Sequence, residues 1–77
     1  MEKLIKFCKN FRIEVLKMTL LEVEQKTHVP LKTISGFENG RSTNINHLNI
    51  YYSLCITKEQ RALFIDGFDK AMGKDIL

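Results

Sequence analysis

The chain contains 77 residues, which is enough for one domain and too few for two. Apolar residues make up 44% of it and charged residues 27%, the balance of a folded globular protein rather than of a disordered tail. No apolar run approaches the ~20 residues that a membrane span needs. The first residues interleave charged and apolar side chains, which a signal peptide does not. We therefore expect a cytoplasmic protein without a membrane partner.

The formal net charge of +3 comes entirely from one half of the chain. Residues 1–41 contain eight Lys or Arg and five Asp or Glu, whereas residues 42–77 contain four of each kind. A basic surface suits a polyanionic partner such as nucleic acid. A solvated lysine-bearing surface accounts for the same distribution, so charge alone does not select a function.

Few residues have the spacing of a chemical site. Cys8 and Cys55 are the only cysteines, and without a nearby Cys or His in ligand spacing they are typical of buried small apolar residues. His28 and His47 lie far apart and match no cysteine pair, so we expect no metal. We also expect no cofactor and no enzymatic activity, since the sequence has no nucleophile–base pair, glycine-rich phosphate loop or evident pair of catalytic carboxylates.

The apolar pattern is helical along the whole chain. A first helix is predicted over roughly residues 2–17, where apolar side chains recur at steps of three and four and so share one face. These side chains are Leu4, Cys8, Phe11, Val15 and Met18, with Phe7 beside them.

A second helix is predicted to begin at Thr19 and Glu22, which have the spacing of a capping box, and to run to about Lys26. His28 follows it. A chain that reverses between two helices often needs a left-handed residue, a conformation that His tolerates better than most residues. We therefore expect the turn at His28.

A third helix is predicted to begin near Pro30, because proline is acceptable in the first turn of a helix and poor anywhere deeper. Ile34 and Phe37 are expected to point inward. Asn39-Gly40 is a normal C-terminal stop, so the helix should end there.

Two more helices complete the chain. Residues 41–44 are polar, and Thr43 or Asn44 is expected to cap a fourth helix. Thr57 and Gln60 have the spacing of a second capping box, which opens a fifth helix over about residues 58–72. The side chains expected on the inner face of the fourth helix are Ile45, Leu48, Tyr52 and Cys55. The sequence thus predicts an all-α domain.

Residues 19–40 resemble, without a gap, the helix-turn-helix signature of the Cro and lambda-repressor family, often called the Xre family. The closing triplet Glu38-Asn39-Gly40 after an apolar residue is the most specific match. The other matching positions are Thr19, Val23, Val29, Ile34 and Phe37. The resemblance covers roughly residues 3–55 and implies a compact five-helix repressor-like domain spanning residues 1–77.

The resemblance also implies how the chain would meet double-stranded DNA. The second helix of such a motif lies in the major groove with its first residues at the base edges, while flanking residues meet the phosphate backbone. The positions implied for base reading are Leu31, Lys32, Thr33, Ser35 and Gly36. The backbone positions are Thr19, Leu20, Asn39, Gly40 and Arg41, to which charge adds Lys17 and Lys26.

Four residues depart from the family pattern. Glu24 stands where a small Ala is usual, so we expect it to tilt outward or to force the two motif helices apart. Thr27 replaces an apolar residue, and His28 replaces a turn glycine. Leu20 replaces the glutamine that usually anchors the helix to a phosphate.

Two functions follow from these features. The first is a transcriptional regulator that binds a palindromic operator as a homodimer, with Leu63, Phe64, Ile65 and Phe68 as the interface unless these residues close the monomer core instead. The second is a protein-binding module, such as an antirepressor or an inhibitor encoded by a phage or mobile element. In that case Leu20, Leu31 and Gly36 would contact another regulatory protein.

Overall fold

The computed structural model describes residues 2–42 and 44–73, with no strand among them. A short π-helical segment, Arg12–Leu16, continues α1, and a 3-10 turn, Ile45–His47, precedes α4. The predicted all-α fold is therefore confirmed. The five α-helices are α1 Glu2–Phe11, α2 Leu20–Thr27, α3 Leu31–Glu38, α4 Leu48–Leu54 and α5 Lys58–Met72.

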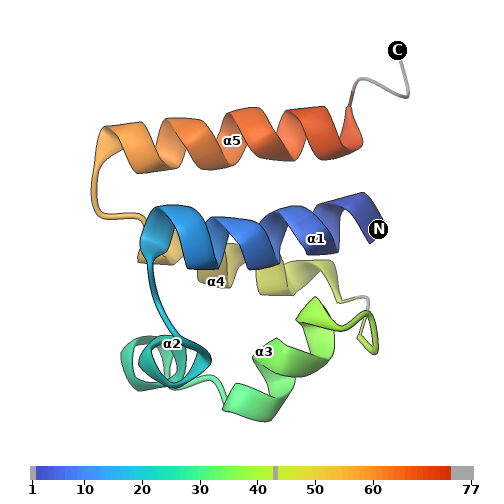
Figure 1. Cartoon of the computed structure of the whole chain (residues 1–77), viewed down its shortest axis with the longest axis vertical. Coiled ribbons are helices and arrows are strands. Elements are labelled where there is room, and N and C mark those ends of the chain that lie inside the picture. Colours follow the sequence, from blue (N-terminus) through green and yellow to red (C-terminus); the bar gives the residue numbers. More distant parts are fainter. Residues whose placement is uncertain (1, 43, 74–77) are drawn as a thin grey trace.

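The helices lie in layers along the longest dimension of the molecule (Figure 1). Helix α5 occupies one end and runs antiparallel to α1, which lies next to it. Helices α2 and α3 occupy the opposite end, and α4 lies behind α1 in this view. The molecule extends over 37 × 29 × 18 Å, so α3 is separated from α5 along its longest axis.

Helices α1 and α5 are joined by aromatic packing. The rings of Phe7, Phe11 and Phe64 form a triangle with centroid separations of 5.1 to 5.7 Å. Gly67 allows the close approach of the two helices, because a Cβ at this position would overlap the Phe7 ring. The α1–α5 contact is therefore apolar and leaves no room for an added methyl group.

The first helix ends differently from a regular α-helix. The chain continues helically to Leu16, close to the predicted end at residue 17, but its last turn is π-helical. Lys17 is left-handed, with φ 54°, and the backbone carbonyl of Arg12 accepts hydrogen bonds from the amides of Lys17 and Met18. One residue thus ends the helix and fixes the direction in which the chain leaves it.

The prediction of the inner face of α4 is wrong for one residue, Tyr52. Tyr51 is fully buried, whereas Tyr52 is 43% exposed. Both tyrosines lie three or four residues from Leu48 and from Cys55, so the spacing fits either one, and Tyr51 is the one whose hydroxyl donates to the buried Glu38 carboxylate. Cys55 is buried and Leu48 half-buried, as the pattern predicts. The side chain of Ile45 lies outside the described residues.

The expected caps are found with some differences. Asn44 accepts a hydrogen bond from the amide of Asn46 at 3.0 Å, at the 3-10 turn before α4, while Thr43 lies outside the described residues. Thr57 caps α5 by accepting from the amide of Gln60 at 3.1 Å. The side chain of Gln60 accepts from the amide of Ile56 instead of Thr57, so the second box is only half formed.

Candidate nucleic-acid interface

Helix α2 begins with the predicted capping box. The amide of Glu22 donates to the Thr19 hydroxyl at 3.1 Å, and the Glu22 carboxylate accepts from the Thr19 amide at 2.9 Å. Hydrogen bonds from the backbone and side chain of Thr19 lower the pKa of the Glu22 carboxyl group. The cap holds this exposed helix start in place by local polar contacts.

The connection between α2 and α3 spans three residues. His28 is left-handed, with φ 62°, as the sequence predicts. The Thr27 hydroxyl donates to the carbonyl of Val23 at 2.7 Å and accepts from the amide of Val29 at 3.3 Å. A polar residue in place of an apolar one therefore satisfies backbone groups at the turn.

Glu24 turns toward α3 rather than outward. Its carboxylate accepts a hydrogen bond from the amide of Leu31 at 3.1 Å. Pro30 has no side-chain oxygen with which to cap α3, so Glu24 supplies the missing acceptor from the preceding helix. The carboxylate is also favourably placed near the positive end of the helix dipole. The larger residue at this position thus joins the two helices.

The positions proposed for base reading differ in exposure. Ile34 and Phe37 are buried, so the opposite side of α3 faces outward. Lys32 is the exposed member of the set. The half-buried members are Leu31, Thr33, Ser35 and Gly36.

The positions proposed for phosphate contact lie on both sides of α3. Leu20 is half-buried and packs against the core. The exposed positions are Lys17, Thr19, Lys26, Asn39, Gly40 and Arg41. The amide of Gly40 already donates to the carbonyl of Phe37 at 3.1 Å, so the proposed contact through that amide competes with an existing hydrogen bond. The Asn39 side chain donates to the Ser35 hydroxyl at 3.2 Å and has a second N–H to offer.

A buried ion pair fixes the end of α3. The Arg12 guanidinium donates to both carboxylate oxygens of Glu38, at 2.8 and 2.9 Å, and to the carbonyl of Met18 at 2.8 Å. The Tyr51 hydroxyl donates to Glu38 at 2.8 Å. The hydrogen bond to Glu38 raises the pKa of Arg12, and burial raises the pKa of Tyr51. The network fixes α1, α3 and α4 relative to one another.

This network is not predicted by the sequence pattern. Arg12 and Tyr51 lie 26 and 13 residues from Glu38, so no local spacing joins them. Glu38 was recognised only as part of the closing triplet of the signature. The one indication in the sequence is Arg12, a charged residue next to the apolar face of the first helix.

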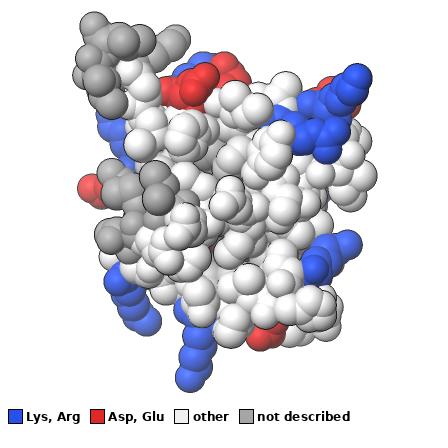
Figure 2. Space-filling model, turned by 180° about the vertical axis from the view of Figure 1, so that it is seen from behind, with Lys and Arg blue, Asp and Glu red and all other residues white. Residues whose placement is uncertain are grey.

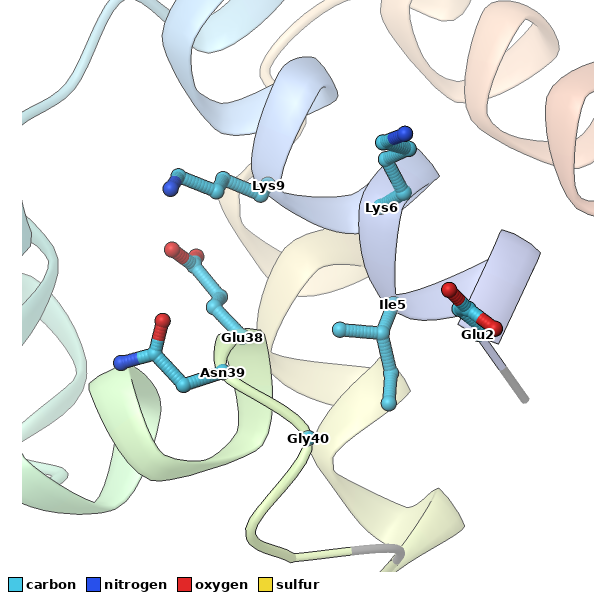
Figure 3. A pocket seen from close by; sticks show the side chains of 7 residues that line it. All are labelled: Glu2, Ile5, Lys6, Lys9, Glu38, Asn39 and Gly40. Atoms are coloured by element: carbon cyan, nitrogen blue, oxygen red, sulfur yellow. The ribbon is translucent and has the colours of Figure 1, made fainter.

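An open cleft of about 610 Å³ lies between α1 and the end of α3. Figure 3 shows Lys9 and Asn39 extending on the same side, with the Glu38 carboxylate between them and Glu2 at the other end of the cleft. Lys6 and Lys9 are not among the predicted site residues. The lining residues are Glu2, Ile5, Lys6, Lys9, Glu38, Asn39 and Gly40.

Three of the four residues expected at a dimer interface line one groove, whereas Leu63 lies outside it. Phe64 is part of the core, Phe68 is half-buried, and Leu63 and Ile65 are 53% and 49% exposed. A groove of about 250 Å³ runs between α4 and α5. Its lining residues are Leu48, Asn49, Tyr52, Phe64, Ile65 and Phe68. The groove thus combines exposed apolar side chains with the edge of the core.

The face seen from behind is largely free of charged side chains at its centre (Figure 2). Residues 42–57, which include α4, contain no Lys, Arg, Asp or Glu. The basic side chains visible in this view lie toward its edges. The molecule therefore separates an uncharged face from its basic regions.

Cys8 and Cys55 are buried free thiols, as expected. Burial raises the pKa of Cys8 to about 12 and raises the pKa of Cys55 as well. Within residues 2–42 and 44–73, no three His, Cys, Asp or Glu side chains are grouped as metal ligands, and no helix has the length and hydropathy to cross a membrane. No protein-family model, curated protein or solved structure matches the chain.

Proposed function

We propose that the chain is a sequence-specific DNA-binding regulator of the Cro and lambda-repressor type, in which α2 and α3 form a helix-turn-helix. The observation that carries the proposal is the arrangement of these helices, two short helices joined by three residues with α3 at one end of the molecule. The proposal includes no cofactor and no catalytic step.

In this proposal the outer side of α3 enters the major groove. Lys32 donates to the guanine acceptors, and Ser35 accommodates several bases. Leu31 contributes only an apolar contact, such as one with a thymine methyl group. Lys17 and Lys26 contact phosphates, which adds salt-dependent affinity without specificity.

The regulator acts as a homodimer on two half-sites about 34–36 Å apart. Helix α3 lies at one end of the long axis, so a twofold axis along that direction keeps both copies of α3 on the same side. The interface then has to be a side face. The groove between α4 and α5, with Ile65 and Tyr52 exposed, suits it because identical uncharged surfaces do not repel each other.

Fluorescence anisotropy with a labelled random-sequence duplex tests the proposal, in a series from about 50 to 200 mM salt. We expect binding that weakens steeply along the series. A folded sample that does not bind at the lowest salt concentration would contradict the proposal. A randomised library then tests for selection of a palindromic site.

A second function, a protein-binding module, is favoured by the composition of α3. This helix contains one lysine and no Arg, Asn or Gln, the side chains that make bidentate contacts with bases. Leu21 is 53% exposed beside Leu20. Leu31→Asp should abolish capture of a protein partner, whereas under the DNA proposal Lys32→Ala and Arg41→Ala should have the larger effects.

A further inference from the structure

The cleft between α1 and α3 contains two lysines that lack an ion-pair partner. Neither Lys6 nor Lys9 is paired with a carboxylate among the described residues, and both are exposed. They lie one helical turn apart on α1 and both line the cleft. Lys9 extends on the side of Asn39 and Lys6 in another direction (Figure 3), and two ammonium groups on the lining of one cleft contribute positive potential to it.

The carboxylates in the cleft leave it with a net positive charge, because Glu38 is paired with Arg12 and Glu2 offsets only one of the two lysines. Glu38 lies between Lys9 and Asn39, but its charge is compensated by Arg12, which donates to both of its oxygens. Glu2 lies at the other end of the cleft. An anion near Lys9 and Asn39 therefore meets a neutral ion pair and one donating amide rather than an uncompensated negative charge.

The position of the cleft relative to α3 identifies the anion. Helix α3 has eight residues and is thus about 12 Å long. The major groove is about 12 Å wide, so a helix of this length that lies in it with its first residues at the base edges brings its last residues near the phosphates that border the groove. The cleft is at that end of α3, with α2 on the other side of the helix (Figure 1).

We infer that this cleft binds a phosphodiester of the DNA backbone through Lys6, Lys9 and Asn39. The inference rests on the proposed function and extends the DNA contact from α2 and α3 to the exposed side of α1. Lys17 and Thr19 hold the backbone on the side of α2, while the cleft holds it at the end of α3. Helix α3 is then fixed in the groove at both of its ends.

The test compares two double variants that remove the same charge. Lys6→Gln with Lys9→Gln alters the cleft, and Lys58→Gln with Lys70→Gln alters α5 at the opposite end of the molecule. Glutamine preserves helix propensity, and the exposed Asp66–Lys70 pair contributes little to stability. Circular dichroism and urea unfolding of both variants check that each one folds.

Binding of each protein to a random-sequence duplex is measured over the same salt series. Each lost phosphate contact lowers the slope of log K against log salt by about 0.9, so the cleft variant should lose about 1.8 from the slope. Its affinity near 0.1 M salt should fall on the order of 10- to 100-fold. The α5 variant should keep the wild-type slope.

Equal slopes for the two variants, with a salt-dependent wild type, would overturn the inference and leave the proposed function standing. A wild-type protein that does not bind the duplex would overturn both. If the wild-type protein binds polyglutamate but not DNA, and the cleft variant loses this binding, the cleft binds an acidic protein and the inference is likewise overturned.

Discussion

The α1–α5 contact and the α2–α3 pair are built in different ways. The first consists of apolar packing, with three phenylalanine rings and a glycine that allows close approach. The second is defined by side-chain hydrogen bonds to backbone groups, from the Thr19–Glu22 box through Thr27 to Glu24. Val23, Ile34 and Phe37 provide its buried apolar contribution.

The two kinds of contact have different effects: apolar packing mainly stabilises the fold, and local hydrogen bonds mainly orient the helices. Burial of large rings is worth a few kcal/mol for each side chain and carries little directional information. Local hydrogen bonds are worth about 1 kcal/mol each but fix the angle at which a helix begins. The orientation of the α2–α3 pair is thus set by local polar contacts, while α1 provides the largest share of the buried apolar side chains.

Glu38→Gln should have the largest effect, because Glu38 connects the two regions. The substitution leaves the Arg12 guanidinium buried without its counter-charge, and loss of one member of a buried ion pair costs about 3–5 kcal/mol. A domain of this size has little more stability than that. We expect a strongly lowered urea midpoint or an unfolded chain, measured by circular dichroism.

Tyr51→Phe is the matched control for Glu38→Gln. It removes one hydrogen bond to Glu38 and leaves both Arg12 donors in place, so the loss should be about 1 kcal/mol. Equal losses for the two variants would show that the charge of the pair contributes nothing beyond its hydrogen bonds.

The free energy of unfolding should fall at alkaline pH. Burial raises the pKa of Cys8 from 9.0 to about 12 and raises the pKa of Tyr51 above its ordinary value of 10.0. Above pH 9 the unfolded chain therefore binds fewer protons than the folded chain, and stability falls as the pH rises. Each such group contributes up to about 1.4 kcal/mol per pH unit.

Urea unfolding in steps from pH 8 to 11 measures this slope. Cys8→Ala should reduce the slope between pH 9 and 10, while Tyr51→Phe should reduce it only above pH 10. A Cys8→Ala protein with the wild-type slope would show that this thiol ionises normally in the folded state.

A Gly→Ala substitution in each region, at Gly67 on α5 and at Gly36 on α3, should have opposite effects on stability. Gly67→Ala should cost about 1–3 kcal/mol, because the added methyl group overlaps the Phe7 ring, which is held between Phe11 and Phe64. Gly36→Ala on α3 has open space around its Cβ, so it should gain up to about 1 kcal/mol of helix propensity. Thermal unfolding of both variants gives the comparison. Two changes of the same sign would contradict the close approach at Gly67.

Local features of the fold were predictable from the sequence, and long-range ones were not. The cap at Thr19, the left-handed His28 and the bounds of α5 follow from residues within four positions of one another. The exposed Lys32 was predictable for the same reason, since Ile34 and Phe37 define the inner side of α3. Helical periodicity therefore located the candidate surface.

The contacts that position this surface join residues far apart in the chain. Arginine is usually found at the surface, and only the folded chain brings Glu38 and Tyr51 into contact with Arg12. Periodicity does not select Tyr51 over Tyr52, because both are spaced three or four residues from Leu48 and from Cys55. Lys6 and Lys9 belong to the cleft only because α1 passes the end of α3.

His28→Gly should have the smallest effect, in the turn between α2 and α3. A left-handed conformation costs a residue with a side chain roughly 1–2 kcal/mol, while glycine adds about 0.5–1 kcal/mol of unfolded-state entropy. The net gain in stability should be about 0.5 kcal/mol, measured by urea unfolding. Lys17→Gly, at the other left-handed residue, should gain a similar amount of stability but lose a phosphate contact. DNA affinity should therefore fall for Lys17→Gly and stay unchanged for His28→Gly; an equal fall in both would attribute it to altered turns rather than to the lysine.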